Sequence, residues 1–255
     1  MLHEIKNINN IGYAILKNKP NNDDLNDRDI NLFRNSITQT VELSRNSLDF
    51  EKIMLNQYQP KENEIDYLEL IRTTVKNFGI PIILDYDNIY PIITDKDKIT
   101  EIFLNGFINA VKHKNLQVIQ IKIEKVENKI LTQIINYIDE DLDINFDDLF
   151  VPYYMKNSAK KDIWKPIIEQ VLAKNEKNWQ KIIPHLHHKP LVHRDKLKGD
   201  ITVPYSFPST GLGLSIAKMI SNVLGGDCGI HYQADKKQVI FWYLTNYQSI
   251  PIQEI

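Results

Sequence analysis

The residues best suited to phosphate chemistry lie in a glycine-containing loop toward the C-terminal end of the chain. Residues 211–218 read Gly-Leu-Gly-Leu-Ser-Ile-Ala-Lys and lead directly into an apolar helical pattern. Glycines at such a place let backbone N–H groups approach phosphate oxygens at the helix N-terminus. A tight loop that leads into a core helix shows the same alternation, so the run alone indicates either a phosphate site or a structural turn.

A second set of polar residues follows one face of a helix predicted at residues 96–112. Asn105, Asn109 and Lys112 lie at positions i, i+4 and i+7, so their side chains share that face. Asparagine is a poor helix former, and two on one face indicate a functional reason. The common alternative is a polar stripe that is simply solvated.

The third candidate is His3, which has Glu4 beside it and Asn7 at the end of the same pentapeptide. An imidazole is largely neutral at about pH 7 and can then act as a nitrogen nucleophile, provided that it is exposed. A histidine this close to a chain end usually has no special role. The segment therefore needs support from the rest of the sequence.

The elements that must position these residues fall into two units. Residues 1–57 carry the apolar stripes of two helices, separated by turn-forming residues at 20–24. Such a hairpin cannot bury both stripes alone, so we expect it to pack against a partner hairpin or another domain. Residues 57–61 read as a linker.

Beyond the linker, helical and strand patterns mix, and we expect an α+β domain over residues 62–247. Helices are predicted at residues 66–77, 96–112 and 215–224. Strands are predicted at residues 81–86, 119–124 and 130–137, with two further short strands within 231–244. Helices grouped against one face of a mixed sheet form a two-layer α/β sandwich.

Composition restricts the class of function. The 255 residues include 42% apolar residues and carry a formal net charge of −2, which does not favour a nucleic-acid or membrane-surface partner. The single cysteine, Cys228, cannot form an internal disulfide and suits a reducing cytosol. The longest apolar run, residues 239–244, is far shorter than the roughly 20 residues of a transmembrane helix. We therefore expect a cytoplasmic protein, with no membrane segment in this chain and no nucleic-acid partner.

Taken in chain order, four segments resemble the sequence boxes of sensor histidine kinases, and together they cover nearly all of the chain. They are residues 3–7 (H box), 95–113 (N box), 149–154 (F box) and 211–218 with Gly225 and Gly226 (second glycine box). The resemblance implies a helical hairpin, residues 1–57, that dimerises into a four-helix bundle. A two-layer sandwich of the GHKL (Bergerat) ATPase type would follow at residues 62–247. It would contain an unusually long lid insert at about 155–209.

The resemblance also implies two cofactors, ATP and Mg²⁺, and the residues that hold them. It assigns Mg²⁺ to Asn109 and phosphate to Lys112, while Asn105 supports the nucleotide and His113 lies beside the adenine. An amide oxygen together with water suits a hard cation such as Mg²⁺. The loop around the phosphates consists of Gly211, Leu212, Gly213 and Leu214.

For the N-terminal segment, the resemblance implies a phosphoacceptor. His3 would accept the phosphoryl group, Glu4 would orient or deprotonate its imidazole, and Asn7 would serve phosphatase activity. Ile8 replaces the usual proline of this box, and His3 lies within the first helical turn. A helix end frays, so a partner helix would have to order the acceptor.

The largest departure from the family concerns the first glycine box, Asp-x-Gly-x-Gly, whose aspartate accepts a hydrogen bond from the adenine amine. Counting back from Phe150 places Asn136 at that position, and both glycines are missing. A neutral amide oxygen is a weaker acceptor than a carboxylate. A shifted alignment makes Asp139 or Asp141 the acceptor instead.

The resemblance predicts an ATP-dependent protein-histidine kinase of a two-component phosphorelay, acting as a homodimer with a response regulator as its partner. The altered first glycine box favours an alternative, namely a histidine phosphotransferase or scaffold without ATP turnover. The basic composition of the lid insert allows a third hypothesis, a GHKL-fold protein-interaction module.

Overall fold

The computed structural model describes residues 57–76, 78–89, 91–113, 118–139, 149–150, 191–198 and 213–247, preceded by residues 44, 48–49, 51–53 and 55. The chain divides into two compact units, Met1–Tyr58 and Gln59–Ile255. The hairpin predicted for residues 1–57 lies almost entirely outside the described residues, and it remains a prediction together with its four-helix bundle. All elements named below belong to the second unit.

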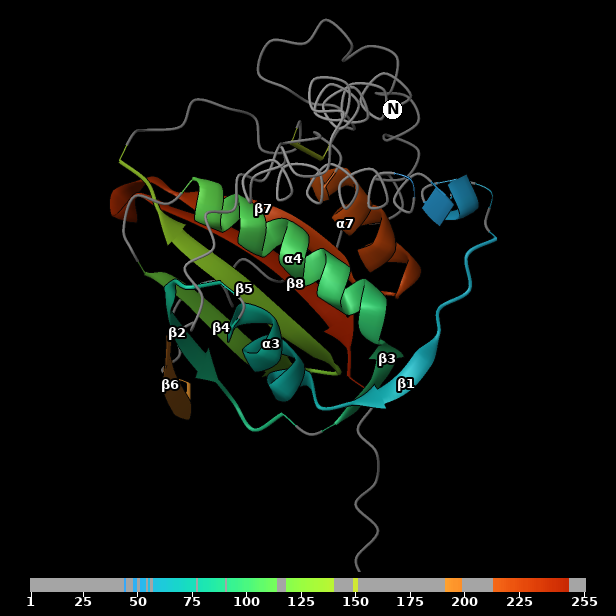
Figure 1. Cartoon of the computed structure of the whole chain (residues 1–255), viewed down its shortest axis with the longest axis horizontal. Helices are drawn as coiled ribbons and strands as arrows, with labels where there is room; N and C mark the ends of the chain where they lie inside the picture. The colour runs from blue at the N-terminus through green and yellow to red at the C-terminus, as the bar shows by residue number, and fades with distance from the viewer. Residues whose placement is uncertain are drawn as a thin grey trace, which may run out of the picture. The chain divides into compact units, whose positions relative to one another are not determined.

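A six-stranded mixed sheet forms the centre of the second unit (Figure 1). Its strands follow the spatial order β6-β2-β4-β5-β8-β7; β2 and β4 are parallel, and every other neighbouring pair is antiparallel. The strands are β2 (Pro81–Tyr86), β4 (Ile119–Val126), β5 (Lys129–Tyr137), β6 (His193–Lys198), β7 (Asp227–Gln233) and β8 (Gln238–Asn246). A separate antiparallel pair is formed by β1 (Glu62–Ile65) and β3 (Ile92–Asp95).

The described helices of this unit lie together on one face of the sheet (Figure 1). They are α3 (Tyr67–Lys76), α4 (Lys96–Lys112) and α7 (Gly213–Val223), and a short 3-10 turn, η4 (Ala234–Lys236), joins β7 to β8. α4 contacts the central strands β5 and β8, and α7 packs beside α4 over β7 and β8. This arrangement confirms the predicted α+β class with a mixed sheet.

Local signals explain where the helices begin and end. The Asp95 carboxylate caps α4 by accepting a hydrogen bond of 3.1 Å from the backbone N–H of Lys98. After α7 the chain turns at Gly225, whose φ of 71° lies in the left-handed region that glycine adopts readily. Within the described residues, no helix has both the length and the apolar character needed to cross a bilayer.

The main core lies between the sheet and the helices. A Cβ atom at Gly106 would overlap the Phe241 ring, so the absence of a side chain lets α4 lie close to β8. The hydroxyl of Tyr67 in α3 forms hydrogen bonds of 2.6 Å with the hydroxyls of Thr132 and Tyr243. These contacts show which strand residues point toward the helices.

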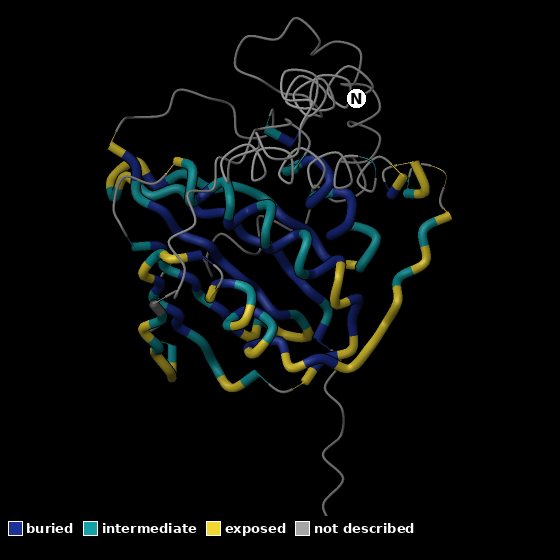
Figure 2. The backbone as a smooth tube through the Cα atoms, viewed as in Figure 1, coloured by how far each residue is buried: buried dark blue, intermediate teal, exposed yellow. Residues whose placement is uncertain are grey.

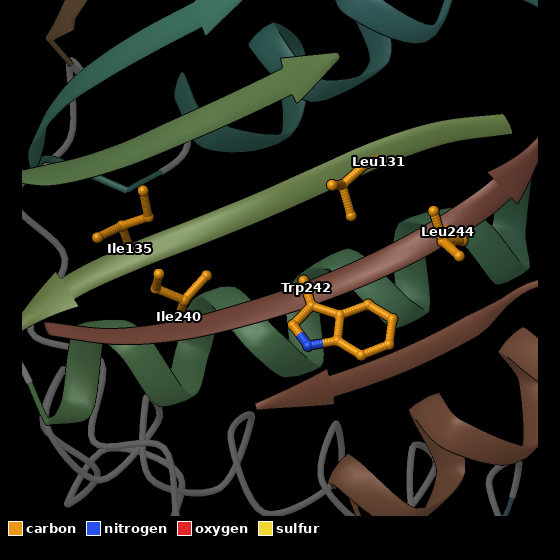
Figure 3. Packing of buried hydrophobic residues seen from close by; sticks show 5 residues of the cluster. All are labelled: Leu131, Ile135, Ile240, Trp242 and Leu244. Atoms are coloured by element: carbon orange, nitrogen blue, oxygen red, sulfur yellow. The ribbon is translucent and has the colours of Figure 1, made fainter. Parts of the chain in front are cut away.

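The opposite face of the sheet is also apolar where β5 and β8 run side by side. Because successive strand residues point to opposite faces, the neighbours of Phe241 and Tyr243 point away from the helices. Five of these side chains form a cluster (Figure 3), each 0–5% exposed: Leu131, Ile135, Ile240, Trp242 and Leu244. Most residues of the central strands are accordingly buried (Figure 2). The sheet is therefore shielded on both faces along these strands.

The edge strand β6 lies within the range predicted as a lid insert, about residues 155–209, for which the sequence predicted no strand. β6 pairs antiparallel with β2 over its whole length. Its charged sequence, His-Arg-Asp-Lys-Leu-Lys, lacks the β-branched residues that signal a strand. Two ion pairs stabilise it instead: Arg194 binds Asp85 of β2 at 2.6 Å, and Asp195 binds Arg72 of α3 at 2.8 Å.

Candidate nucleotide-binding site

The polar face of α4 meets the start of α7 at Asn105 and Gly213. A Cβ atom at Gly213 would lie 2.6 Å from Oδ1 of Asn105, closer than real Cβ contacts. A larger residue at the start of α7 would therefore have to displace the Asn105 side chain. This contact brings together two predicted site residues from segments that lie far apart in the sequence.

α4 presents the predicted polar residues because its other face is anchored in the core. Its buried residues are Lys98, Ile99, Ile102, Phe103, Gly106, Phe107 and Ala110. Asn105, Asn109 and Lys112 are only half-buried and follow one another along the remaining face. The spacing read from the sequence thus corresponds to a continuous polar stripe on a packed helix.

Lys112 occupies a partly desolvated position in the last turn of α4. Burial lowers the pKa of its ammonium group below the usual value, because removal from water disfavours the charged form. An anionic group beside Lys112 would stabilise the charged form again. The electrostatics of this position therefore suit an anionic ligand such as a phosphate.

Asn136 lies in β5, is 3% exposed, and is connected to the C-terminal end of α4. Its Nδ2 donates a hydrogen bond to the backbone carbonyl of His113 at 3.4 Å, which is long for such a bond. His113 is the C-cap of α4, and its own N–H donates to the carbonyl of Asn109. Three of the predicted site residues, namely Asn109, His113 and Asn136, are thus linked through the end of this helix.

The alternative acceptors from the shifted alignment occupy different environments. Asp139 is exposed just after β5, where its backbone carbonyl accepts a hydrogen bond from Lys237 at 2.9 Å. Asp141 lies outside the described residues. Of the acceptors that the structure describes, Asn136 is the buried one beside α4.

An ion pair that sequence reasoning missed connects α7 to the start of β7. The Lys218 ammonium binds the buried carboxylate of Asp227 and also donates to the carbonyl of Cys228 at 2.7 Å. It lies 5.6 Å from the centre of the Phe150 ring, which belongs to the predicted F box. The sequence did not reveal this ion pair, because Asp227 comes next to Lys218 only when α7 and β7 pack together.

Other predicted site residues fall outside the described residues: His3, Glu4, Asn7, Gly211 and Leu212. Of the glycine loop, the structure shows Gly213 and Leu214 as the first residues of α7. No cluster of three or more metal-ligating side chains occurs among the described residues. Mg²⁺ at Asn109 would therefore depend on one amide oxygen, water and the phosphates of a bound nucleotide, a coordination that suits this ion.

Comparison by sequence finds no matching family model and no matching curated protein. Comparison by structure finds histidine kinases. The histidine kinase AdeS of Acinetobacter baumannii superposes with a TM-score of 0.58 at 14% identity, over 97% of this chain and 98% of that chain. Full-length ShkA in complex with AMPPNP gives 0.55 at 15% identity, over 98% of this chain and 46% of that chain.

A third similar structure is the histidine kinase ThkA in complex with the response regulator protein TrrA. Its TM-score is 0.51 at 16% identity, over 97% of this chain and 60% of that chain. This chain thus spans less than two thirds of the ShkA and ThkA chains. At these identities the likeness concerns the fold, and it agrees with the order of boxes in the sequence. The chain thus has a fold similar to that of solved histidine kinases.

Proposed function

We propose that this protein is an ATP-dependent protein-histidine kinase of a two-component phosphorelay. The observation that carries the proposal is the packing of Asn105 against Gly213, which puts the polar stripe of α4 beside the start of α7. The N-terminus of a helix favours anions through its free N–H groups and its dipole. The fold supports the same function, since the similar structures include ShkA in complex with AMPPNP and ThkA in complex with a response regulator protein.

The proposed nucleotide site lies between α4 and the glycine loop at residues 211–214. Lys112 contacts phosphate there, and Asn109 holds Mg²⁺ through its amide oxygen. Bound Mg²⁺ supplies neutralisation of phosphate charge. At the other end of the site, the amide oxygen of Asn136 accepts a hydrogen bond from the adenine amine beside His113. The bond from Asn136 Nδ2 to the His113 carbonyl supports this orientation of the amide.

The proposed phosphoacceptor is His3, oriented by Glu4. Its neutral Nε2 forms a bond to the γ-phosphorus of ATP while the bond from that phosphorus to the bridging oxygen breaks and ADP leaves. An aspartate of a response regulator then receives the phosphoryl group, and Asn7 serves the phosphatase reaction. Positioning and charge neutralisation account for most of the catalysis of such transfers.

Dimerisation and a location in the cytoplasm belong to the same proposal. The hairpin of residues 1–57 dimerises, because two apolar helical stripes need a partner to cover them. Cys228 is buried and forms no disulfide, which agrees with a reducing compartment, so we place the kinase in the cytoplasm.

Thermal unfolding with and without ATP and Mg²⁺ tests the nucleotide site. A ligand that binds only the folded state raises the melting temperature. We expect a Mg²⁺-dependent rise with the unchanged protein that is absent with Asn109→Ala. Asn128→Ala is the matched control, because Asn128 is an exposed asparagine in the turn between β4 and β5. A rise that persists in Asn109→Ala would contradict the assignment of this residue.

The position of Asn136 favours a second candidate function, a histidine phosphotransferase or scaffold without ATP turnover. A neutral side chain stands where the family has a carboxylate, and its amide is engaged with His113. This candidate predicts no stabilisation at millimolar ATP, but exchange of phosphate between His3 and a phosphorylated regulator. Stabilisation by Mg²⁺-ATP would exclude it.

A further inference from the structure

The ammonium group of Lys218 connects α7 to two other parts of the chain. It binds the Asp227 carboxylate at the start of β7 and donates a hydrogen bond to the Cys228 carbonyl at 2.7 Å. It also lies over the Phe150 ring, 5.6 Å from the ring centre. The Lys218 side chain is 14% exposed and that of Asp227 is 1% exposed, so water has little access to this charge.

The contact between Lys218 and Phe150 is of the cation–π type. A cation within about 6 Å of a ring centre is attracted by the negative face of the ring, and the attraction is larger when the pair is desolvated. Phe150 is buried, and Lys218 is mostly shielded from water. Apolar packing is therefore not the sole attraction that holds Phe150 at α7.

Lys218 lies on the same face of α7 as a residue of the glycine loop. It follows Leu214 by four residues, so the two side chains share one helix face about 6 Å apart along the axis. Gly213 and Leu214 are the first residues of this helix, and Gly213 meets Asn105 of α4. The Lys218 contact thus attaches Phe150 to the helix face that starts at the glycine loop.

A purely structural role explains these contacts less well. Replacing a buried ion pair by apolar residues often leaves stability unchanged or raises it, so the pair alone gives little reason for a lysine at this place. Arg72 provides a comparison, because it binds Asp195 at 2.8 Å and lies 5.1 Å from the centre of the Tyr86 ring. Those contacts attach an edge strand, whereas those of Lys218 belong to the helix that continues the glycine loop.

We propose that Lys218 is a positioning residue of the nucleotide site. It holds Phe150 on the Leu214 face of α7, so that the F box and the glycine loop keep one arrangement before nucleotide binds. The proposal rests on the proposed function, because it requires that the glycine loop receives phosphate. Lys218 acts without touching the nucleotide, since Asp227 and Cys228 already engage its ammonium group. A preorganised site loses less conformational freedom on binding and therefore binds more tightly.

A double-mutant cycle on ATP affinity tests the proposal. Phe150→Leu removes the ring and leaves the ion pair, whereas Lys218→Met removes the cation from a side chain of similar length. We expect each substitution to raise the Kd for Mg²⁺-ATP about threefold to tenfold. The double variant should bind no more weakly than the weaker single variant, because both substitutions break one contact. Isothermal titration measures the Kd, and far-UV circular dichroism verifies that each variant is folded.

Three further variants separate positioning from a loss of stability alone. Lys218→Arg keeps a cation beside the ring and should restore the Kd to within about twofold of the unchanged protein. Arg72→Met and Tyr86→Leu are the matched controls, because they break the same kind of contact at β6 and should leave the Kd unchanged. An equal loss of affinity in these controls would overturn the proposal.

The cycle itself can also contradict the proposal. Independent effects of Phe150→Leu and Lys218→Met, which multiply in the double variant, would overturn it. An unchanged Kd in either folded single variant would do the same. Phe150→Leu provides this test alone if Lys218→Met does not fold.

Amide hydrogen exchange without nucleotide gives a readout that does not depend on the proposed function. In Lys218→Met the peptide that contains residues 149–150 should exchange several-fold faster, because its contact with α7 is lost. Lys218→Arg and Arg72→Met should match the unchanged protein. Unchanged exchange in folded Lys218→Met would overturn the proposal even if ATP binds. If the unchanged protein does not bind ATP, the proposed function is wrong, and the exchange data decide separately whether Lys218 positions the F box.

Discussion

The side-chain amide of Asn136 donates a hydrogen bond to the backbone carbonyl of His113, and this bond links β5 to the C-terminal cap of α4. The Nδ2 group of Asn136 therefore binds within the protein. Its Oδ1 oxygen is the atom that can accept a hydrogen bond from a ligand. A carboxylate at this position would gain charge but would place an oxygen against the His113 carbonyl oxygen.

Asn136→Asp should therefore change nucleotide binding and stability in opposite directions. Hydrogen bonds to charged groups are worth about 1 kcal/mol more than neutral ones, so we expect the Kd for ATP to fall about fivefold. The free energy of unfolding without nucleotide should fall by about 1–3 kcal/mol, because a buried acceptor loses its donor partner. Isothermal titration and urea unfolding measure the two effects.

Asn136→Ala serves as the comparison for this substitution. It removes both the contact to His113 and the proposed contact to adenine, so stability and ATP affinity should fall together. Equal ATP affinity in Asn136→Asp, Asn136→Ala and the unchanged protein would show that residue 136 does not touch the nucleotide.

Gly213→Ala should weaken nucleotide binding much more than it affects folding. The added Cβ would lie 2.6 Å from Oδ1 of Asn105, at the flexible end of a half-buried side chain that can move. Displacement of that carboxamide would disturb the proposed site, and we expect ATP affinity to fall at least about tenfold, or about 1.4 kcal/mol. Fluorescence titration with a labelled nucleotide measures the change.

Gly106→Ala is the matched glycine control for the packing of α4. Its Cβ would overlap the Phe241 ring in the core, so the free energy of unfolding should fall by about 1–3 kcal/mol. Gly213→Ala should lose far less stability than this. The opposite order of stability losses would mean that Gly213 is a structural residue and not part of a ligand site.

The sequence predicted α4 well because its periodicity is strong and its ends carry clear signals. The predicted range, residues 96–112, is the observed one, and Asp95 provides the cap. The short strands β1 and β3 were missed, since four residues with mixed polarity leave too little pattern. β6 was missed because ion pairs with Asp85 and Arg72, not apolar alternation, attach it to the sheet.

The candidate site was predictable where neighbours in one helix define it and unpredictable where the fold creates the contacts. The stripe of Asn105, Asn109 and Lys112 follows from helical spacing alone. The approach of Gly213 to Asn105, and the bond from Asn136 to His113, depend on the packing of α7 and β5 against α4. Spacing within a single segment contains no information on such contacts.

The attachment of β6 to β2 should weaken at acidic pH, because the Asp85 carboxylate that binds Arg194 becomes protonated. Burial alone would raise the pKa of this carboxyl, but hydrogen bonds from Arg194 and Gln120 outweigh burial and hold its pKa below the usual value. A carboxyl with a lowered pKa in the folded state contributes stability above its unfolded pKa of about 3.9. That contribution is lost as the pH falls through the folded pKa.

Asp85→Asn should therefore reduce the free energy of unfolding by about 1–2 kcal/mol at neutral pH, a modest value because the partner arginine is largely exposed. The difference from the unchanged protein should shrink progressively once the pH falls below about 4. Urea unfolding at neutral and acidic pH measures it. A difference that stays constant over this range would show that the charge of Asp85 contributes nothing.

Lys218 and Asp227 should behave as a coupled pair that fixes α7 to the start of β7. Lys218→Met leaves the Asp227 carboxylate buried without its cation, and Asp227 Oδ2 already has no hydrogen-bond partner among the described residues. We expect this substitution to reduce the free energy of unfolding by about 3–5 kcal/mol. Adding Asp227→Asn should recover part of the loss, because a neutral amide replaces the unpaired charge. Urea unfolding of the two single variants and the double variant gives the coupling energy. Strictly additive losses would mean that the two side chains act independently, and α7 would then be held by apolar packing alone.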